Sequence, residues 1–556
     1  MTDADPFATH EVFNQSPVFE GVNLFTSDRA LGEAVAREGA GWAADELAAA
    51  GAALGSAETI EHGRLANENP PVLKLFDAKG RRLDAVEFHP SYHALMALTM
   101  GHGSHCGPWE HLATGGRPRA GATVARAAKV YMTNQVEAGH HCPITMTHAV
   151  VPTLLFQEDL AKEWIPRIAV RRYDPAFRPA ADKASVTFGM GMTEKQGGTD
   201  VRANATTAEP TGDGAYRLVG HKWFLSAPMS DAFLMLAQAP GGLSCFLVPR
   251  FLPDGTVNPL RLQRLKPKVG NRSNASSEVE LPGTHGWLIG EEGRGVRTII
   301  EMATYTRFDC ALSSAGMMRM ALAQCLNHVA HRTVFQKKLI DQPMMRRVLA
   351  DMALEVEAAT ALTMRLGRAY DRALPTEEPD PSEAAYKRIM TPAAKYWVCK
   401  AGPAFAYEAM ETLGGNGYVE DGLMGRIYRE MPVNAIWEGS GNVMCLDVLR
   451  AIEREPEAAD ALVAGFETGG EPRLAAAVGR LRGLLAQRSG LEARARLVTE
   501  LLVAVAAGTL LQAHAPAAVA DGFLATRLAP DRGRCYGALE TAIDETAILE
   551  RAMPVG

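Results

Sequence analysis

The chain has 556 residues, of which 47% are hydrophobic and 22% are charged, and its formal net charge is −7. This length exceeds what one compact core usually holds, and the composition argues against long disordered segments. The net charge provides no general affinity for nucleic acid, so any DNA binding has to come from a local cluster of basic residues. The eight cysteines form no CxxC pair, which indicates reduced thiols rather than a disulfide framework.

The sequence predicts neither an export signal nor a membrane-spanning segment. The N-terminal segment MTDADPFATHEVFNQSP is acidic and polar, without a basic start followed by an apolar core. The longest apolar run, residues 501–511 (LLVAVAAGTLL), is shorter than the roughly 20 residues that cross a bilayer. We therefore expect a core helix at this run and a cytoplasmic protein that does not insert into membranes.

The predicted elements follow the order helices, strands, helices, and a helical extension. Residues 27–174 are Ala-rich with helical spacing, whereas short apolar runs separated by GDG, PGG and PDG turns begin near residue 184. Amphipathic runs at 298–332, 343–372 and 382–413 have the length of bundle helices. We predict an α+β protein with domains at 1–183 (helical), 184–285 (β), 286–450 (helical bundle) and 451–556 (helical extension).

Four short stretches carry most of the chemical information. They are GMGMTEKQGGTDV at 189–201, GHKWFLS at 220–226, ETLGGNGY at 411–418 and IWEGSGNVMCL at 436–446. Hydroxyls and backbone amides in a Gly-Gly loop suit a ligand rich in acceptors, such as a flavin edge or a phosphate. Taken singly, each stretch also fits an ordinary structure: a hairpin, a β-core strand, a Gly-terminated helix and a charged helix start.

Taken together, and in this order, these stretches and the R-x-x-F element at Arg332 resemble the acyl-CoA dehydrogenase superfamily over about residues 151–450. The resemblance implies a helical domain, a central β-barrel domain and a four-helix bundle, with FAD as the cofactor. It also implies at least a dimer, and for most members a homotetramer built as a dimer of dimers.

The resemblance assigns FAD contacts to particular residues of this chain. The loop beside the flavin ring matches Thr193 and Thr199, and the strand that packs on the ring matches Phe224, Leu225 and Ser226. Arg332, Phe335 and the LGGNG turn match elements that reach the cofactor of a neighbouring subunit, although Gln336 replaces the usual glycine. The full set of expected cofactor contacts is Met190, Gly191, Met192, Thr193, Gly197, Gly198, Thr199, Phe224, Leu225, Ser226, Arg332, Phe335, Gly414, Gly415, Ile436, Trp437, Gly439, Ser440, Gly441 and Asn442.

Glu438 matches the catalytic base of the superfamily. The reaction needs a carboxylate that removes the α-proton of an acyl thioester, and desolvation has to raise the pKa of such a base. Trp437 and the apolar residues around it are expected to exclude water there.

Within the superfamily the chain resembles the AidB-like DNA-alkylation-response flavoproteins. The runs MTEKQGGTDV, YMTNQVEAGHHCPITMTHAVVP and IYREMPVNAIWEGSGN carry this resemblance, together with the Arg-bearing extension. It implies a role in protecting DNA from alkylation or destroying alkylating agents, with double-stranded DNA as a partner bound through the C-terminal region. It also implies acyl-CoA or an alkylating small molecule as a further partner, and at most weak dehydrogenase activity toward short branched acyl-CoA.

The extension itself supports DNA binding only in part. Residues 451–556 contain 11 Arg, no Lys and 14 acidic residues, but the arginines cluster. We expect phosphate contacts from Arg450, Arg480, Arg482, Arg488, Arg494, Arg496, Arg527, Arg532 and Arg534. A solvated charged face is the alternative interpretation.

Two groups of residues resemble metal ligands, His102/His105/Cys106 and His140/His141/Cys142. Their spacing matches no known zinc pattern, so no metal site is predicted.

Three functions remain open at this point. The first is a flavoprotein that shields DNA or destroys alkylating agents, and the second is a metabolic dehydrogenase of short or branched acyl-CoA that uses Glu438. The third is a structural protein in which the flavin serves only stability.

Overall fold

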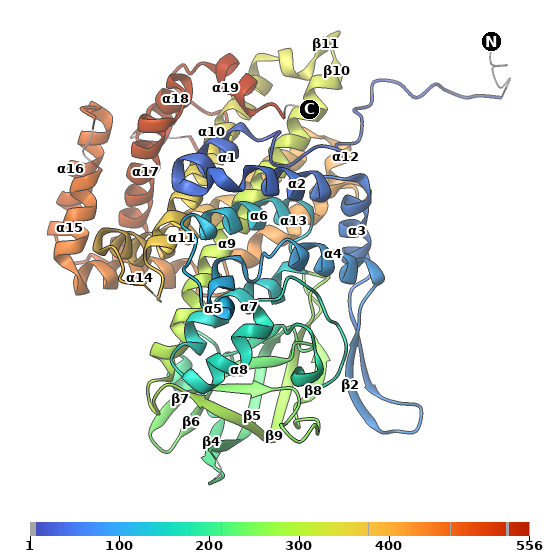
Figure 1. Ribbon diagram of the computed structural model, residues 1–556. Coiled ribbons are helices and arrows are strands. Elements are labelled where there is room, and N and C mark those ends of the chain that lie inside the picture. Colours follow the sequence, from blue (N-terminus) through green and yellow to red (C-terminus); the bar gives the residue numbers. More distant parts are fainter. Residues whose placement is uncertain (1–6, 213, 376, 467–468, 530–532, 555–556) are drawn as a thin grey trace.

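The computed structural model describes residues 7–212, 214–375, 377–466, 469–529 and 533–554. Its architecture is α+β, with helices around a central β structure, as predicted. The helical bundle lies above the sheet in Figure 1, and the helices of the extension flank one side of the bundle.

The N-terminal region contains eight α-helices and a β-hairpin. The helices are α1 (Arg29–Val35), α2 (Ala44–Leu54), α3 (Ala57–Glu68), α4 (Pro90–Gly101), α5 (Glu110–Thr114), α6 (Ala122–Val136), α7 (His141–Leu154) and α8 (Glu158–Ile168). Short helical turns occur along the whole described chain. They are the π turn η1 (Ala36–Ala40) and the 3₁₀ turns η2 (Gly41–Ala43), η3 (Gly107–Trp109), η4 (Ala180–Asp182), η5 (Val201–Ala203), η6 (Leu339–Asp341) and η7 (Glu492–Arg494).

The hairpin of β1 (Val72–Phe76) and β2 (Arg82–Glu87) is a difference from the helical pattern expected for this region. Strand β1 alternates exposed and half-buried residues, and the turn between the strands closes at Gly80, where φ is +80°. Leu73, Leu75 and Val86 pack against the core of the central β structure. The hairpin therefore depends on a distant partner, which helical periodicity in the flanking segments does not indicate.

The central β structure is a seven-stranded sheet in the order β3-β5-β4-β6-β7-β9-β8. Its strands are β3 (Phe188–Gly191), β4 (Thr207–Pro210), β5 (Ala215–Ser226), β6 (Ala232–Ala239), β7 (Gly242–Pro249), β8 (Arg261–Leu265) and β9 (Ser276–Ile289). An additional pairing of β5 with β9 closes the sheet on itself around its own apolar core. β3 delivers the Gly-Gly loop, and the end of β5 delivers residues 224–226.

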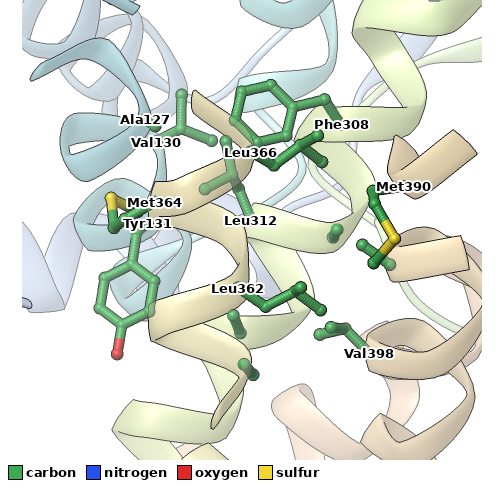
Figure 2. Packing of buried hydrophobic residues seen from close by; sticks show 14 of the residues in the cluster. Ala127, Val130, Tyr131, Phe308, Leu312, Leu362, Met364, Leu366, Met390 and Val398 are labelled. Atoms are coloured by element: carbon green, nitrogen blue, oxygen red, sulfur yellow. The ribbon is translucent and has the colours of Figure 1, made fainter. Parts of the chain in front are cut away.

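The bundle consists of long helices close to the predicted ranges. They are α9 (Gly295–His331), α10 (Pro343–Arg372), α11 (Pro381–Thr412), α13 (Leu423–Asn434) and α14 (Gly441–Arg454), with the short elements β10 (Thr333–Val334), β11 (Lys337–Lys338) and α12 (Gly415–Tyr418) between them. Asp380 caps α11 by accepting hydrogen bonds from the amides of Ser382 and Glu383. Figure 2 shows the core that α6 shares with α9, α10 and α11, including Tyr131, Phe308, Leu362 and Met390.

The extension consists of α15 (Pro456–Gly465), α16 (Pro472–Ala486), α17 (Ala495–His514), α18 (Ala517–Arg527) and α19 (Glu545–Ala552). The apolar run at 501–511 is the interior of α17, which packs against α10, α11 and α14. By length and composition, the segment Glu492–His514 is able to cross a membrane, and 56% of its most apolar window is buried inside the protein. The extension and the bundle thus share one continuous core.

Candidate active site and arginine pocket

Glu438 lies in a turn between α13 and α14 whose backbone is fixed by two cationic side chains. Its φ is +57°, a left-handed conformation that needs outside support in a non-glycine residue. Arg307 Nε donates to the Glu438 carbonyl at 2.9 Å, and Lys395 Nζ donates to the carbonyls of Trp437 at 2.7 Å and Gly439 at 2.5 Å. Three successive carbonyls of the turn are therefore held, and the direction of the Glu438 side chain with them.

Glu438 is half-buried, and its carboxyl lies against α9. Thr306 Oγ1 donates to Glu438 Oε2 at 2.9 Å. Burial raises the pKa of Glu438 above its ordinary value, while the Thr306 hydrogen bond and the charges of Arg307 and Lys395 oppose this rise. These are the properties that a general base for a weakly acidic C–H group needs.

A cavity of about 50 Å³ adjoins Glu438 between α6, α7, α9 and α13. A water molecule needs at least about 10–15 Å³ by this measure, so the cavity has room for a group of only a few non-hydrogen atoms. Its walls are formed mostly by apolar atoms, with a few polar groups among them. The lining residues are Asn134, Ala138, His141, Cys142, Thr145, Met146, Ser226, Thr306, Asp309, Cys310, Ser313, Glu430, Asn434, Trp437 and Glu438.

The loop after β3 is held rigid by a buried ion pair. Lys222 Nζ on β5 lies 2.7 Å from Glu194 Oε1, and both side chains are fully buried. Glu194 also accepts from the amides of Ala205 at 2.7 Å and Thr206 at 3.2 Å. At Gly198 an added Cβ would lie 2.3 Å from Thr193 Oγ1, so only glycine allows the loop to close over this hydroxyl.

The polar and apolar groups around this loop fit the edge and face of a flavin. Within the described part of the chain, the hydroxyls of Thr193, Thr199, Ser226 and Ser440 make no side-chain hydrogen bond, which leaves them available to a ligand. Phe224 lies near the end of β5 and is 44% exposed, whereas its neighbour Leu225 is fully buried.

The other residues assigned to the cofactor lie in several elements around the loop after β3 and the Glu438 turn. The Leu225 side chain is fully buried in the core of the β structure, so it presents no side-chain surface to a ligand there. Met190 and Gly191 lie in β3, Met192, Gly197 and Gly198 in the loop, and Ile436, Trp437, Gly439, Gly441 and Asn442 around the Glu438 turn. The Asn442 Oδ1 atom is already bonded by Arg496 Nε at 2.9 Å.

A second group of assigned residues lies far from Glu438 within one chain. Arg332 follows the C-terminal end of α9, 25 residues after Arg307, which corresponds to about 37 Å along the helix. Phe335 is 91% exposed and has a φ of +51°. Gly414 and Gly415 lie in the turn before Tyr418, which is 82% exposed. The length of α9 places Arg332 too far away to contact a flavin ring beside Glu438 of its own chain.

On the other side of Arg307 lies a pocket of about 910 Å³ that we call the arginine pocket. Seven arginines from the β structure, α9, α11 and α14 line it: Arg202, Arg294, Arg297, Arg307, Arg388, Arg450 and Arg454. Arg307 and Arg388 share Asp447, at 2.9 and 2.8 Å. Among the described residues, Arg202, Arg297, Arg450 and Arg454 have no side-chain hydrogen bond or ion pair. The lining also includes the carboxylates of Glu301 and Asp447, so the arginines outnumber the acidic residues in this pocket.

The arginines predicted from the extension have different environments. Arg480, Arg482, Arg488, Arg496 and Arg534 are exposed. Arg494 instead bonds the loop before it, through Gln487 and the carbonyl of Ser489. Arg532 lies outside the described residues.

The assignment of Arg527 to DNA is wrong. Its side chain is 2% exposed and lies between Asp351 and Glu355 of α10, with 2.7 Å to Glu355 Oε2. The arginine neutralises two buried carboxylates and fastens α18 to the bundle, which leaves no donor for a phosphate. The cluster of arginines in the sequence gave no sign of this because both acidic partners lie more than 170 positions away.

The histidine and cysteine groups are used inside the fold. His105 Nε2 pairs with the carbonyl of Val170 at 3.0 Å, and His140 lies between Glu137 at 2.8 Å and Thr99 at 2.9 Å. In the described part of the chain, no group of three His, Cys, Asp or Glu residues has the arrangement of a metal site.

Several residues of both sites were not predicted from the sequence. Thr306, Arg307, Lys395, Glu194 and Lys222 support the Glu438 turn and the Gly-Gly loop. Arg202, Arg294, Arg297, Arg388 and Arg454 complete the arginine pocket. They come from five separate segments, and the chain carries no local pattern that brings these segments together.

Comparisons with known proteins agree with this geometry. Three family models match: the adaptive response protein AidB N-terminal domain over residues 14–175, the acyl-CoA dehydrogenase middle domain over 189–283, and the acyl-CoA dehydrogenase C-terminal domain over 293–453. AidB of Escherichia coli (strain K12), named as an acyl-CoA dehydrogenase, is 51% identical over 93% of this chain and 94% of its own length. Acyl-CoA dehydrogenase family member 11 of Caenorhabditis elegans is 31% identical over 70% of this chain and 64% of its own.

Similarity to a solved structure extends over nearly the whole chain. The crystal structure of Caenorhabditis elegans ACDH-11 in complex with C11-CoA has a TM-score of 0.83 and 25% sequence identity. It covers 99% of this chain and 94% of that one.

Proposed function

The chain belongs to the AidB-like branch of the acyl-CoA dehydrogenase family, whose cofactor is FAD, and from this premise we propose that it acts in the response to DNA alkylation. In this role it binds double-stranded DNA and shields it or destroys alkylating agents nearby. Its activity as an acyl-CoA dehydrogenase is weak.

The arginine pocket is the observation that carries this proposal. Four arginines without partners face a space of about 910 Å³ in a protein whose net charge is −7. Such a concentration of positive charge suits a polyanion, because each phosphate that it neutralises releases condensed counterions. Arg450, predicted from the sequence as a DNA contact, lines this pocket.

The Glu438 site supplies the chemistry of the proposal. Bound FAD would be held by Thr193, Thr199 and Ser226 and would supply the hydride acceptor. Glu438 removes the α-proton of the bound acyl group, and its raised pKa makes it a stronger base than an exposed carboxylate. Arg307 and Lys395 keep the turn in place while the carboxylate gains this proton.

The test is a titration of the flavin-loaded protein with duplex DNA at two salt concentrations. Reversing two pocket charges, Arg297→Glu with Arg454→Glu, is expected to lower affinity roughly 50-fold at 0.1 M salt and to reduce the salt slope by about two. The matched control reverses two exposed arginines of the extension, Arg480→Glu with Arg488→Glu. An equal loss of DNA affinity in both double variants would mean that the DNA contact also includes the extension. If the unaltered protein does not bind DNA, the DNA role is rejected.

Charge reversal is a better test than removing the extension. The α17 helix shares its core with α10, α11 and α14, so truncation after Arg450 would expose apolar surface of the bundle. A loss of DNA binding in that truncated chain would then have two causes.

A metabolic dehydrogenase of short acyl-CoA is the second candidate. The small cavity beside Glu438 and the raised pKa of this carboxyl favour it. Rapid bleaching of the flavin by a short acyl-CoA, with no DNA binding, would select this function over the first.

We also propose a homotetramer in which the flavin site is completed by a neighbouring subunit. The distance of about 37 Å along α9 between Arg307 and Arg332 supports this arrangement. The exposure of Phe335 and Tyr418 also favours it. Measurement of the molar mass in solution tests the proposal, and Phe335→Asp is expected to reduce both the assembly and the flavin content.

A further inference from the structure

Several of the polar groups that line the Glu438 cavity are hydrogen-bonded to one another. Ser313 Oγ donates to Asn134 Oδ1 at 2.7 Å, and Asn434 Nδ2 donates to Ser313 Oγ at 3.1 Å. Trp437 Nε1 donates to Asn434 Oδ1 at 3.1 Å. Among the described cavity residues, only His141 has a buried polar atom without a partner, its Nε2.

The partners of His141 determine which of its nitrogens carries the proton. Arg126 donates to both oxygens of Asp309, at 2.7 and 2.6 Å, so this carboxylate accepts from its other neighbour too. That neighbour is Thr145, whose hydroxyl donates to Asp309 Oδ2 at 2.9 Å. The hydroxyl has a single proton, so its oxygen can only accept from His141 Nδ1, which lies 3.0 Å away. His141 therefore carries its proton on Nδ1 and a lone pair on Nε2.

His141 keeps this form across the physiological pH range. Its side chain is 3% exposed, and burial together with the charge of Arg126 holds the pKa of His141 well below its ordinary value. The ring is thus a neutral hydrogen-bond acceptor rather than a pH switch.

A buried acceptor without a donor destabilises the protein, unless a bound molecule provides the donor. The cavity has room for a short group of a few non-hydrogen atoms beside Glu438. A purely hydrocarbon acyl chain would leave His141 Nε2 unsatisfied, whereas a hydroxyl on the chain would satisfy it.

We propose that the cavity selects a short acyl group that carries a hydroxyl, and that His141 Nε2 is the acceptor that determines this specificity. The inference rests on the proposed acyl-CoA chemistry at Glu438. The relay of Arg126, Asp309 and Thr145 acts through His141 by fixing its proton on Nδ1.

The test compares acyl-CoA pairs in which a hydroxyl replaces a methyl group of the same size. One pair is 3-hydroxybutyryl-CoA with isovaleryl-CoA, and the other is 4-hydroxybutyryl-CoA with pentanoyl-CoA. Each compound is titrated anaerobically into the flavin-loaded protein, and the dissociation constant is read from the change in flavin absorbance. We expect the hydroxylated member of at least one pair to bind about tenfold more tightly.

Three variants separate the role of His141 from a general effect on the cavity. His141→Leu is expected to reverse the preference, so that the methyl compound binds more tightly. Thr145→Val keeps the imidazole but removes the acceptor for Nδ1–H, and the preference is expected to shrink. Cys142→Ala changes the cavity without removing an acceptor, and the preference is expected to remain.

One kind of outcome contradicts only the role of His141, and another contradicts the acyl-CoA function itself. If both members of each pair bind equally, or if His141→Leu keeps the preference, the assignment to His141 is wrong, while the acyl-CoA function stands. If no acyl-CoA perturbs the flavin, the acyl-CoA function itself fails and the inference fails with it. Should His141→Leu lose its flavin, the same comparison in Thr145→Val decides.

Discussion

The Glu438 cavity and the arginine pocket share Arg307 but differ in nearly every other property. The cavity has a volume of about 50 Å³, and several of its polar groups are bonded to one another, while His141 Nε2 has no partner in the described chain. The pocket has a volume of about 910 Å³, and four of its seven arginines have no partner within the described chain. Arg307 bonds the Glu438 carbonyl and also Asp447, which lines the pocket.

This difference separates two kinds of recognition. The cavity is preorganised, so its ligand has to match fixed hydrogen-bonding groups in a desolvated space. The pocket attracts anions through charges that remain hydrated and mobile, so its binding depends strongly on salt and weakly on shape. Variants in the arginine pocket are therefore expected to change the binding of anions, and variants in the cavity are expected to change the selection and chemistry of the acyl group.

The largest effect is expected from Glu438→Gln. Without the carboxylate the α-proton is not removed, and flavin reduction by a short acyl-CoA slows by about 10³- to 10⁴-fold. Stopped-flow absorbance measures this rate, and DNA affinity in the same preparation should be unchanged.

Glu430→Gln is the matched control, because Glu430 is a second buried carboxylate in the cavity and is bonded to Asn271 at 2.8 Å. It is expected to stay within about tenfold of the unaltered rate. A comparable loss in both variants would show that charge in the cavity, rather than proton removal by Glu438, controls the reaction.

The next effect concerns Arg527, which the sequence grouped with the DNA contacts. Arg527→Met removes the buried cation that lies between Asp351 and Glu355 and should lower the free energy of unfolding by about 3–5 kcal/mol. Denaturant unfolding measures this loss, and Arg480→Met is a control on an exposed arginine with an expected change below about 0.5 kcal/mol. Weaker DNA binding by folded Arg527→Met would restore Arg527 to the DNA contacts.

The position of Arg527 illustrates what the sequence could predict and what it could not. The long helices α9, α10 and α11, the strands β5, β6 and β7, the family and its FAD cofactor follow from periodicity and motifs, and all are confirmed. These features depend on residues that are close in sequence. The β1–β2 hairpin depends instead on packing against β8 and the distant core, and it was missed.

The two sites differ in the same respect. Glu438 was identified because it lies inside a contiguous motif, whereas the residues that hold its turn, Thr306, Arg307 and Lys395, are 43 or more positions away. The arginine pocket collects side chains from the β structure, α9, α11 and α14, and of these only Arg450 was predicted. Long-range assembly of charges leaves no signal in local composition.

Reversal of charge in the arginine pocket should separate binding from chemistry. In Arg297→Glu with Arg454→Glu, the dissociation constant of a short acyl-CoA is expected to rise about tenfold, because the phosphates of CoA lose attraction. The limiting rate of flavin reduction at saturation should remain, since the bound acyl group still meets Glu438.

An N-acetylcysteamine thioester of the same acyl group, which has no phosphate, is the control for this variant. Its dissociation constant should be the same with and without the two substitutions. A change in the limiting rate for either compound would mean that the pocket and the cavity are not independent.

The smallest effect tests whether Lys395 tunes the base as well as holding its turn. Lys395 is 1% exposed and bonds two carbonyls, with no carboxylate in ion-pair contact in the described chain. Its charge lowers the pKa of Glu438, against the rise caused by burial. Because only the carboxylate accepts a proton, flavin reduction is lost as pH falls through this pKa.

Lys395→Met should therefore move the midpoint of the rate–pH profile to higher pH and lower the rate above it by roughly tenfold, as the turn loses two bonds. Lys395→Arg keeps the charge, so its midpoint should stay near that of the unaltered protein even if its rate falls. The two variants separate the electrostatic role from the mechanical one. An equal fall in rate at every pH in Lys395→Met, with the midpoint unmoved, would leave Lys395 only the role of holding the Glu438 turn.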